Sequence, residues 1–258
     1  MGITGTDVAK GAADMILTDD NFTTIVHAIE EGRNIYNNIK KAVIFLLSCN
    51  LGEVISIFVA ILFDMPVPLI ATQILWVNLI TDALPALALG VDPGDHDVMK
   101  SKPRDPKESF FAHGAGFRAI VGGVLIGILT LAAFYFGLSE HGYSFFSDEI
   151  PEKVLEYART MAFVVLASSQ LFYALSLRHE SKSIFQIGIF SNIYLIGSII
   201  VGLILQMSVI EIDSLAAMFK CVDLNAHDWE MVFAFALMPL VVNEIEKLVT
   251  RMISKSDE

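Results

Sequence analysis

The sequence has little charge and few basic residues. Only 18% of its 258 residues are Asp, Glu, Lys or Arg, whereas 54% are hydrophobic. Soluble domains contain about 25% charged residues, so a chain of this composition cannot hide its apolar side chains in one soluble core. The mean hydropathy of +0.60 agrees with this. The composition therefore excludes an ordinary soluble domain and favours a membrane protein.

The shortage of basic residues also limits the possible partners. Lys and Arg number 17 against 29 Asp and Glu, which gives a net charge of −12. Nucleic-acid binding requires Lys and Arg contacts with phosphates, so we expect no nucleic-acid partner. Cys49 lies in an apolar run and Cys221 does not, so a disulfide between them is not expected. The N-terminal region lacks the features of a signal peptide. The sequence contains no phosphate-binding Gly loop and no Ser-His-Asp constellation.

Long hydrophobic runs, by contrast, are abundant. A bilayer core about 30 Å thick is crossed by about 20 apolar residues in a helix. The clearest of six such runs has no charge from Ala119 to Leu138. The expected spans are residues 42–63, 68–91, 117–138, 157–177, 192–212 and 229–249. The sequence therefore predicts an all-α membrane protein, with a bundle of six transmembrane helices in residues 42–258.

Basic residues concentrate on one side of these spans. They occur before the first span, in the loops after the second and fourth, and in the C-terminal tail; only Lys153, Arg159 and Lys220 lie on the other side. Positive residues are retained in the cytoplasm. We therefore expect a multi-pass protein of the lipid bilayer with both termini cytoplasmic. The loop 92–116 is polar and contains prolines, and we expect it to be an ordered inner loop.

The segment before the first span has a different character. The sequence predicts a short helix at Thr6–Ala13 and a short strand at Asp14–Leu17, which are too small to bury a core. Residues 1–21 are therefore interpreted as the edge of a larger domain. From Phe22 onward, apolar residues repeat at helical spacing into the first span, which predicts one helix of about forty residues. Residues 22–41 would form a cytoplasmic stalk or, alternatively, an amphipathic helix lying on the bilayer.

Polar side chains interrupt the first two spans. Asn50 and Glu53 share one face of the first, because residues three apart lie one above the other on a helix. Asn78, Thr81 and Asp82 share one face of the second. An Asp at the centre of a membrane helix costs about 2.5–3.5 kcal/mol on insertion scales. Such residues are therefore candidates for a functional site.

These side chains offer only oxygen ligands. Gln170 in the fourth span adds another, and Pro85 frees a backbone carbonyl one turn earlier. Calcium takes about six to eight oxygen ligands, whereas zinc and copper prefer nitrogen or sulfur. We therefore predict a site for a cation, with calcium favoured. The alternative is that these groups only form hydrogen bonds between helices.

Several motifs resemble P-type cation-transporting ATPases. Glu31-Gly-Arg-Asn-Ile-Tyr-Asn-Asn-Ile-Lys resembles the link between the phosphorylation domain and the fifth transmembrane helix of that family. Ser48-Cys-Asn-Leu-Gly-Glu resembles the polar centre of that helix. Gln73-Ile-Leu-Trp-Val-Asn-Leu-Ile-Thr-Asp-Ala-Leu-Pro resembles the sixth helix of the calcium-pump branch, of sarcoplasmic-reticulum type. Lys102-Pro-Arg-Asp-Pro-Lys is similar to the inner loop that follows.

The resemblance implies that the chain is the C-terminal membrane part of a calcium pump. Residues 1–21 would be a remnant of an α/β phosphorylation domain. The catalytic aspartate, the nucleotide domain and four further helices would belong to a missing N-terminal part. ATP and magnesium would act only through those missing domains, and the fragment alone would not be catalytically competent.

The resemblance also implies a ligand set for the transported calcium ion. The implied ligands are Asn50, Glu53, Asn78, Thr81 and Asp82. At the corresponding eighth-helix position, pumps of sarcoplasmic-reticulum type carry a glutamate, and this chain carries Gln170.

That difference leaves a sodium-type pump open as an alternative. A standalone six-span scaffold or regulator is a second alternative. A six-span secondary carrier is less favoured, because the halves show no internal repeat.

Overall fold

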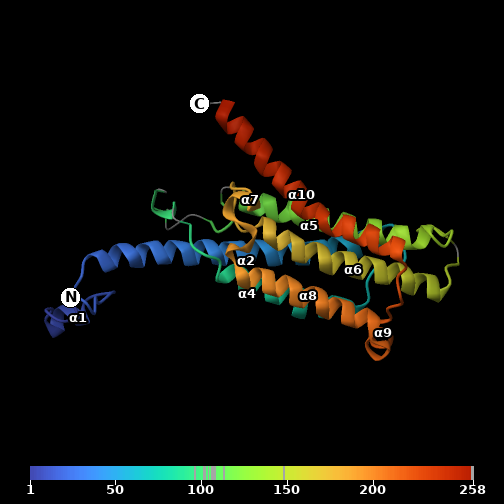
Figure 1. Cartoon of the computed structure of the whole chain (residues 1–258), viewed down its shortest axis with the longest axis horizontal. Helices are drawn as coiled ribbons and strands as arrows, with labels where there is room; N and C mark the ends of the chain where they lie inside the picture. The colour runs from blue at the N-terminus through green and yellow to red at the C-terminus, as the bar shows by residue number, and fades with distance from the viewer. Residues whose placement is uncertain are drawn as a thin grey trace.

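The computed structural model describes residues 1–95, 97–100, 103, 105, 109–112, 114–147 and 149–256, with side chains to residue 253. The regular elements in this part of the chain are all helical (Figure 1). They are α1 (Asp7–Gly11), α2 (Thr23–Leu62), α3 (Ala71–Trp76), η1 (Val77–Asp82), α4 (Ala83–Gly90), η2 (Val98–Lys100), α5 (Ala115–Ser139), α6 (Glu152–Ser176), α7 (Ile184–Ile187), η3 (Ile189–Ser191), α8 (Ile193–Glu211), α9 (Asp213–Phe219) and α10 (Ala226–Ser256). Part of the expected inner loop, including Lys102, Arg104 and Lys107, lies outside the described residues.

The long helix predicted from Phe22 onward is confirmed. α2 contains 40 residues without a break, and its first half extends beyond the bundle in Figure 1. Two side chains from this half hold the loop after α4. Asn38 Nδ2 donates to the Asp92 carbonyl at 2.7 Å, and Arg33 Nη1 donates to the Val98 carbonyl at 3.0 Å. The first half of α2 is therefore attached to the loop that follows α4.

The structure supports five membrane-crossing helices, whereas six were expected. By length and composition, the described candidates are α2, the continuous segment α3–η1–α4, α5, α6 and α8. α10 occupies the place of the expected sixth span and is not among them. Its apolar residues are accompanied by four charged ones, Glu230, Glu244, Glu246 and Lys247. Charged residues disfavour insertion into the membrane, so the composition of α10 is less typical of a transmembrane helix.

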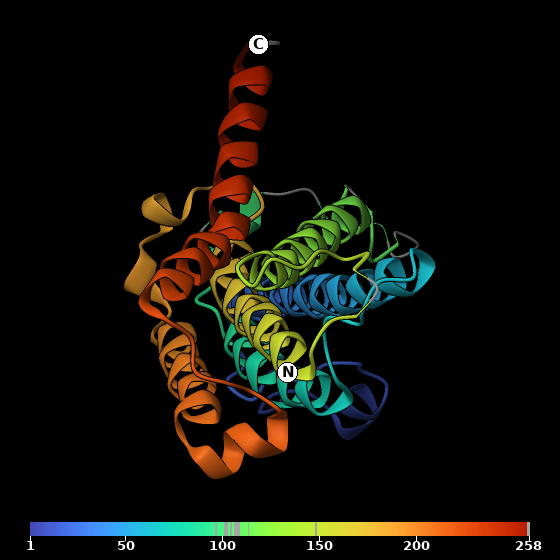
Figure 2. The same cartoon turned by 90° about the vertical axis from the view of Figure 1, so that its right-hand side faces the viewer.

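α6 forms the centre of the bundle. In its most apolar stretch 89% of the residues are buried, compared with 39% for α8. α6 contacts α2, α4, α5, α8 and α10, and the view in Figure 2 shows these helices around it. Most side chains in this stretch of α6 therefore face other helices of the bundle, whichever side of α6 they lie on.

The short strand expected at Asp14–Leu17 is not formed, so that prediction was wrong. The segment is irregular, although Gly2 N donates to the Leu17 carbonyl at 2.6 Å. A strand requires a partner strand to satisfy its backbone, and the described residues provide none. α1 does lie within the expected helix, with Thr6 as N-cap accepting from Ala9 N at 3.3 Å.

Candidate cation site

The candidate site lies between α2 and the irregular helix η1. A short link, residues 63–70, joins α2 to α3 and places the two segments side by side. Glu53 is 4% exposed and Asp82 is 1% exposed. Asn78 Nδ2 donates to Glu53 Oε2 at 2.8 Å and to the Ile74 carbonyl at 3.0 Å. The polar faces predicted from helical spacing on the two spans therefore meet.

The segment η1, which carries Asn78, Thr81 and Asp82, has π-helical geometry. Pro85 follows η1 and has no N–H to donate to the carbonyl one turn before it. π-helical turns widen the helix locally and occur frequently at functional sites. Thr81 Oγ1 donates to the Val77 carbonyl at 3.0 Å, so its hydroxyl is held within η1. The π-helical segment ends at Asp82, and Pro85 itself lies within α4.

Several buried polar atoms at this site have no hydrogen-bond partner among the described residues. They are Glu53 Oε1, both carboxylate oxygens of Asp82 and both amide atoms of Gln170. About 90% of buried polar groups in proteins are paired, so a cluster of unpaired ones requires an explanation. Gln170 and Asp82 both lie close enough to Glu53 to interact with it electrostatically. The unpaired atoms thus belong to one cluster.

Two of the expected site residues contribute less in this structure. Asn50 is exposed, and its Nδ2 donates to the Leu46 carbonyl of its own helix at 2.8 Å. Thr81 is buried, but its hydroxyl is already bonded within η1. The structure therefore brings Glu53, Asn78, Asp82 and Gln170 together and leaves Asn50 outside.

Cys49 is a further neighbour of the cluster, and the sequence analysis did not include it among the site residues. It is fully buried and lies beside Asp82. Its position four residues before Glu53 places it on the same face of α2, which is the signal that could have identified it. The described residues contain no group of three or more His, Cys, Asp or Glu suited to hold a metal. Any cation here would therefore depend on amide and carbonyl oxygens as well as two carboxylates.

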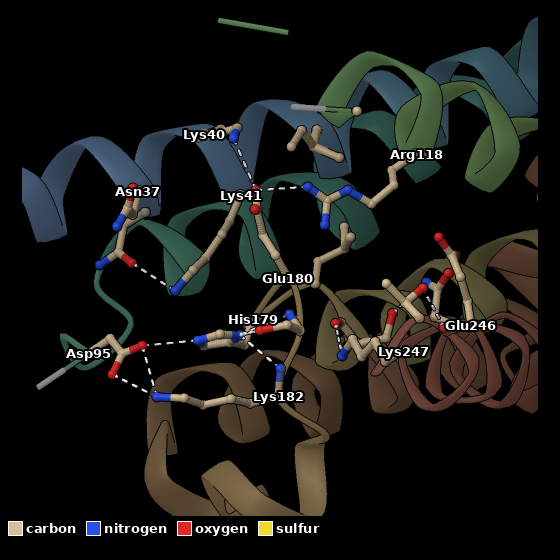
Figure 3. Close-up of a pocket in the computed structure, with 18 of the residues that line it drawn as sticks. Asn37, Lys40, Lys41, Asp95, Arg118, His179, Glu180, Lys182, Glu246 and Lys247 are labelled. Atoms are coloured by element: carbon tan, nitrogen blue, oxygen red, sulfur yellow. Dashed lines mark hydrogen bonds and ion pairs between the residues drawn. The ribbon is translucent and has the colours of Figure 1, made fainter. Parts of the chain in front are cut away.

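A second polar region, which sequence reasoning did not find, lies where α5 begins and α6 ends. A cavity of about 750 Å³ is bordered by α2, the loops after α4 and α6, α5 and α10. Figure 3 shows charged side chains from these elements joined across it. Lys40 Nζ and Arg118 Nη2 lie 3.0 and 2.9 Å from the same oxygen of Glu180. Glu180 thereby connects α2 with α5.

Asp95 forms the other junction at this cavity. Lys182 Nζ donates to its two oxygens at 3.0 and 3.1 Å, and His179 Nε2 lies 2.9 Å from Oδ2. Burial disfavours the ionised carboxyl, but hydrogen bonds from the Asp97 backbone, Lys182 and His179 outweigh it and hold the pKa of Asp95 well below its usual range. Burial lowers the pKa of His179, and Asp95 opposes that shift. Asp95 thus joins the loop after α4 to the loop after α6, whereas Lys247, which also lines this cavity, pairs with Glu244 of its own helix.

Comparison with known proteins identifies the family. The family model "Cation transporting ATPase, C-terminus" matches residues 66–249. A calcium-transporting ATPase 1 of Bacillus cereus is 55% identical over 256 residues, which cover 97% of this chain and 29% of that protein. A calcium-transporting ATPase of Bacillus subtilis is 44% identical over 93% of this chain and 26% of its own length. One from Plasmodium falciparum is 37% identical over 100% of this chain and 24% of its own length.

The chain thus spans less than a third of the length of these curated relatives. The family match covers most of the helical bundle, including η1, α6 and the greater part of α10. It therefore includes Asn78, Asp82 and Gln170 of the candidate site. By this match, the chain belongs to the family of cation-transporting ATPases, in its C-terminal region.

Proposed function

We propose that the chain is the C-terminal transmembrane part of an ATP-driven, calcium-transporting P-type ATPase and that it supplies part of the intramembrane calcium site. The observation that carries the proposal is the cluster of unpaired buried atoms on Glu53, Asp82 and Gln170. The relatives that match nearly the whole chain bear the name calcium-transporting ATPase. Calcium is then the transported substrate.

The donor set suits a hard cation. Glu53 and Asp82 supply negative charge, and Asn78 and Gln170 supply amide oxygens. Thr81 and Asn50 complete the proposed set once their side chains turn away from their own helices. Calcium accepts flexible coordination by carboxylate, amide and carbonyl oxygens, so two carboxylates on separate helices are compatible with it. The ion would replace mutual repulsion between Glu53 and Asp82 with attraction.

The long helix α2 supports a mechanical role for the N-terminal segment. Residues 1–21 are proposed as the remnant of a phosphorylation domain, and residues 22–41 as the cytoplasmic stalk. Since α2 continues unbroken from Thr23 to Leu62, a displacement of its first turns would be transmitted to Glu53. That displacement would change the distance between Glu53 and Asn78, and with it the affinity for the cation. ATP and magnesium would act through the part of the pump that precedes this chain.

We further propose that α10 is a sixth span and that both termini are cytoplasmic. α10 contains 31 residues and is about 45 Å long at ~1.5 Å per residue, enough to cross a bilayer. Lys247 Nζ donates to Glu244 Oε1 at 2.8 Å, which neutralises two of the charges that weaken its membrane character. The concentration of Lys and Arg on one side supports the orientation.

A chimeric pump tests the proposal. Residues 1–258 would replace the matching C-terminal segment of the Bacillus cereus calcium-transporting ATPase, and ATP-driven uptake of radioactive calcium would be measured in vesicles. Uptake is expected in the chimera and is expected to be lost in Glu53→Gln and Asp82→Asn. Asp64→Asn, which changes a carboxylate outside the cluster, serves as the matched control.

The outcomes separate the possible transported ions. Uptake of sodium without calcium would favour a sodium-type pump. A folded, membrane-inserted chimera that takes up calcium equally well with and without Glu53 and Asp82 would show that the site lies elsewhere. A standalone scaffold would leave the chimera inactive although it is correctly assembled.

A further inference from the structure

Tyr157 contacts two carboxyl groups at the end of the bundle opposite the cavity of Figure 3. It lies near the start of α6, where α5 ends and α10 begins. Its hydroxyl donates to Asp228 Oδ2. The hydroxyl oxygen of Tyr157 also lies 3.3 Å from Glu140 Oε2, and Asn225 Nδ2 donates to this hydroxyl oxygen at 3.1 Å. The Tyr157 hydroxyl on α6 therefore contacts side chains from the residue that follows α5, from α10 and from the loop before α10.

A count of protons shows that this arrangement is incomplete when both carboxyls are ionised. A tyrosine hydroxyl has one proton to donate and two lone pairs to accept with, and an ionised carboxylate can only accept. The Tyr157 proton is used toward Asp228, and Asn225 fills one lone pair. The contact with Glu140 becomes a hydrogen bond only if a further proton lies on the carboxyl side. With that proton present, every hydrogen-bonding position of the Tyr157 hydroxyl is used.

The burial of Asp228 is a second and independent observation. Its side chain is 0% exposed, and Oδ1 has no hydrogen-bond partner among the described residues. Oδ2 accepts from Asn225 N at 2.8 Å as well as from Tyr157. An ionised Glu140 beside this buried carboxyl would add repulsion between like charges.

The neighbouring groups do not remove this repulsion. His227 on α10 interacts electrostatically with Glu140, but its side chain is 62% exposed and its Nδ1 lies 3.7 Å from Glu230. The His141 ring packs edge-on against the Tyr157 ring, with 4.7 Å between the ring centroids. The Nδ1 atom of His141 lies 3.2 Å from the Gly137 carbonyl oxygen. Glu140 is exposed, but partial desolvation raises its pKa, and the adjacent Asp228 raises it further. Tyr157 lowers it less than these two causes raise it.

We propose that Glu140 and Asp228, bridged by Tyr157, form a binding site for one proton that fastens the beginning of α10 to the end of α5 and the start of α6. The inference is independent of the proposed calcium transport. Because the pKa of Glu140 is raised in the folded state, the fastening is complete below the ordinary pKa of glutamate and is lost as pH rises through the raised value. On the side of the membrane where this end lies, acidification would tighten α10.

The test uses the chain in neutral-lipid nanodiscs. The unfolding midpoint would be measured from about pH 4, near the ordinary pKa of glutamate, up to about pH 9. Infrared difference spectra over the same range would report the carbonyl band of a protonated carboxylic acid. The wild-type midpoint is expected to fall by a few degrees as pH rises, together with loss of that band.

Glu140→Gln is the informative variant, since its amide donates to Tyr157 at every pH and Glu140 is exposed enough for the variant to fold. It should flatten the pH dependence and remove the acid band. Asp228→Asn should also flatten it, whereas the control Glu230→Gln should behave like the wild type. The proposal is overturned if Glu140→Gln keeps the wild-type slope, if no acid band titrates, or if calcium at constant pH stabilises the wild type but not Glu140→Gln.

Discussion

Asp92 and Arg178 form a buried ion pair, with Arg178 Nε 2.9 Å from Asp92 Oδ1, although 86 positions separate them in the chain. Their side chains are 3% and 1% exposed. Lys41 Nζ lies 2.9 Å from the other oxygen of Asp92, and Asn192 Nδ2 donates to Oδ1 at 2.8 Å. One carboxylate thus connects the base of the stalk, the end of α4, the end of α6 and the start of α8.

Removal of one partner from this ion pair is expected to destabilise the bundle strongly. In Arg178→Leu, the buried Asp92 carboxylate loses its main counter-ion, which typically costs about 3–5 kcal/mol. The control is Lys100→Leu, because Lys100 is 81% exposed in its pair with Asp97 and such pairs contribute about 0–1 kcal/mol. Thermal unfolding in nanodiscs would measure both. Similar small effects in the two variants would contradict the importance assigned to Asp92.

Close packing of α2 on α5 is expected to be sensitive to a single methyl group. A Cβ on Gly123 would lie 2.8 Å from Leu51 Cβ and 2.9 Å from the Ser48 carbonyl, which cannot move aside easily. Gly123→Ala should therefore cost about 1–3 kcal/mol of stability and displace the helix that carries Glu53. Gly197→Ala is the matched control, since no heavy atom lies within 4 Å of its added Cβ. Gly197→Ala should be neutral or stabilising, because alanine favours helix.

The ion pairs of Asp95 are expected to make the cavity region acid-sensitive. The pKa of Asp95 is depressed in the folded state, so its contribution is present above the unfolded value of about 4 and is lost as pH falls below it. The wild type should lose stability on acidification from pH 6 to about pH 3 more steeply than Asp95→Asn. Asp213→Asn in α9 serves as the control. If Asp95→Asn loses stability on acidification as steeply as the wild type, the ion pairs of Asp95 are not the cause of the acid sensitivity.

Gln170→Glu is expected to strengthen calcium binding in the chimeric pump and make it more dependent on pH. The variant places a third carboxylate beside Glu53, and each carboxylate must lose its proton before it binds the ion. Calcium dependence of uptake, measured at several pH values, would report both effects. Gln206→Glu is the control, because this buried glutamine accepts from Trp76 Nε1 at 3.1 Å outside the cluster. A gain in Gln206→Glu equal to that in Gln170→Glu would show a nonspecific effect of charge.

The helices themselves follow from the sequence. Long apolar runs must be helical in lipid, because each backbone group then finds its partner within the segment. The breaker-free pattern from Phe22 predicted α2, and the proline at position 85 predicted a freed carbonyl near η1, although not its π-helical geometry. Helical spacing placed Glu53 on the polar face of the first span, and it placed Asn78 and Asp82 together on the polar face of the second span. These are local properties, determined by residues within a few turns of one another.

Tertiary structure decided which of those faces meet. The depth and rotation of α2, η1 and α6 bring Gln170 to Glu53 and leave Asn50 outside, and no local spacing specifies contacts between separate helices. Local spacing likewise does not specify the partners of Asp92 or the two carboxyl groups that contact Tyr157, because these contacts also join separate segments. The strand expected at Asp14–Leu17 failed because a strand depends on a neighbour, whereas a membrane helix satisfies its own backbone.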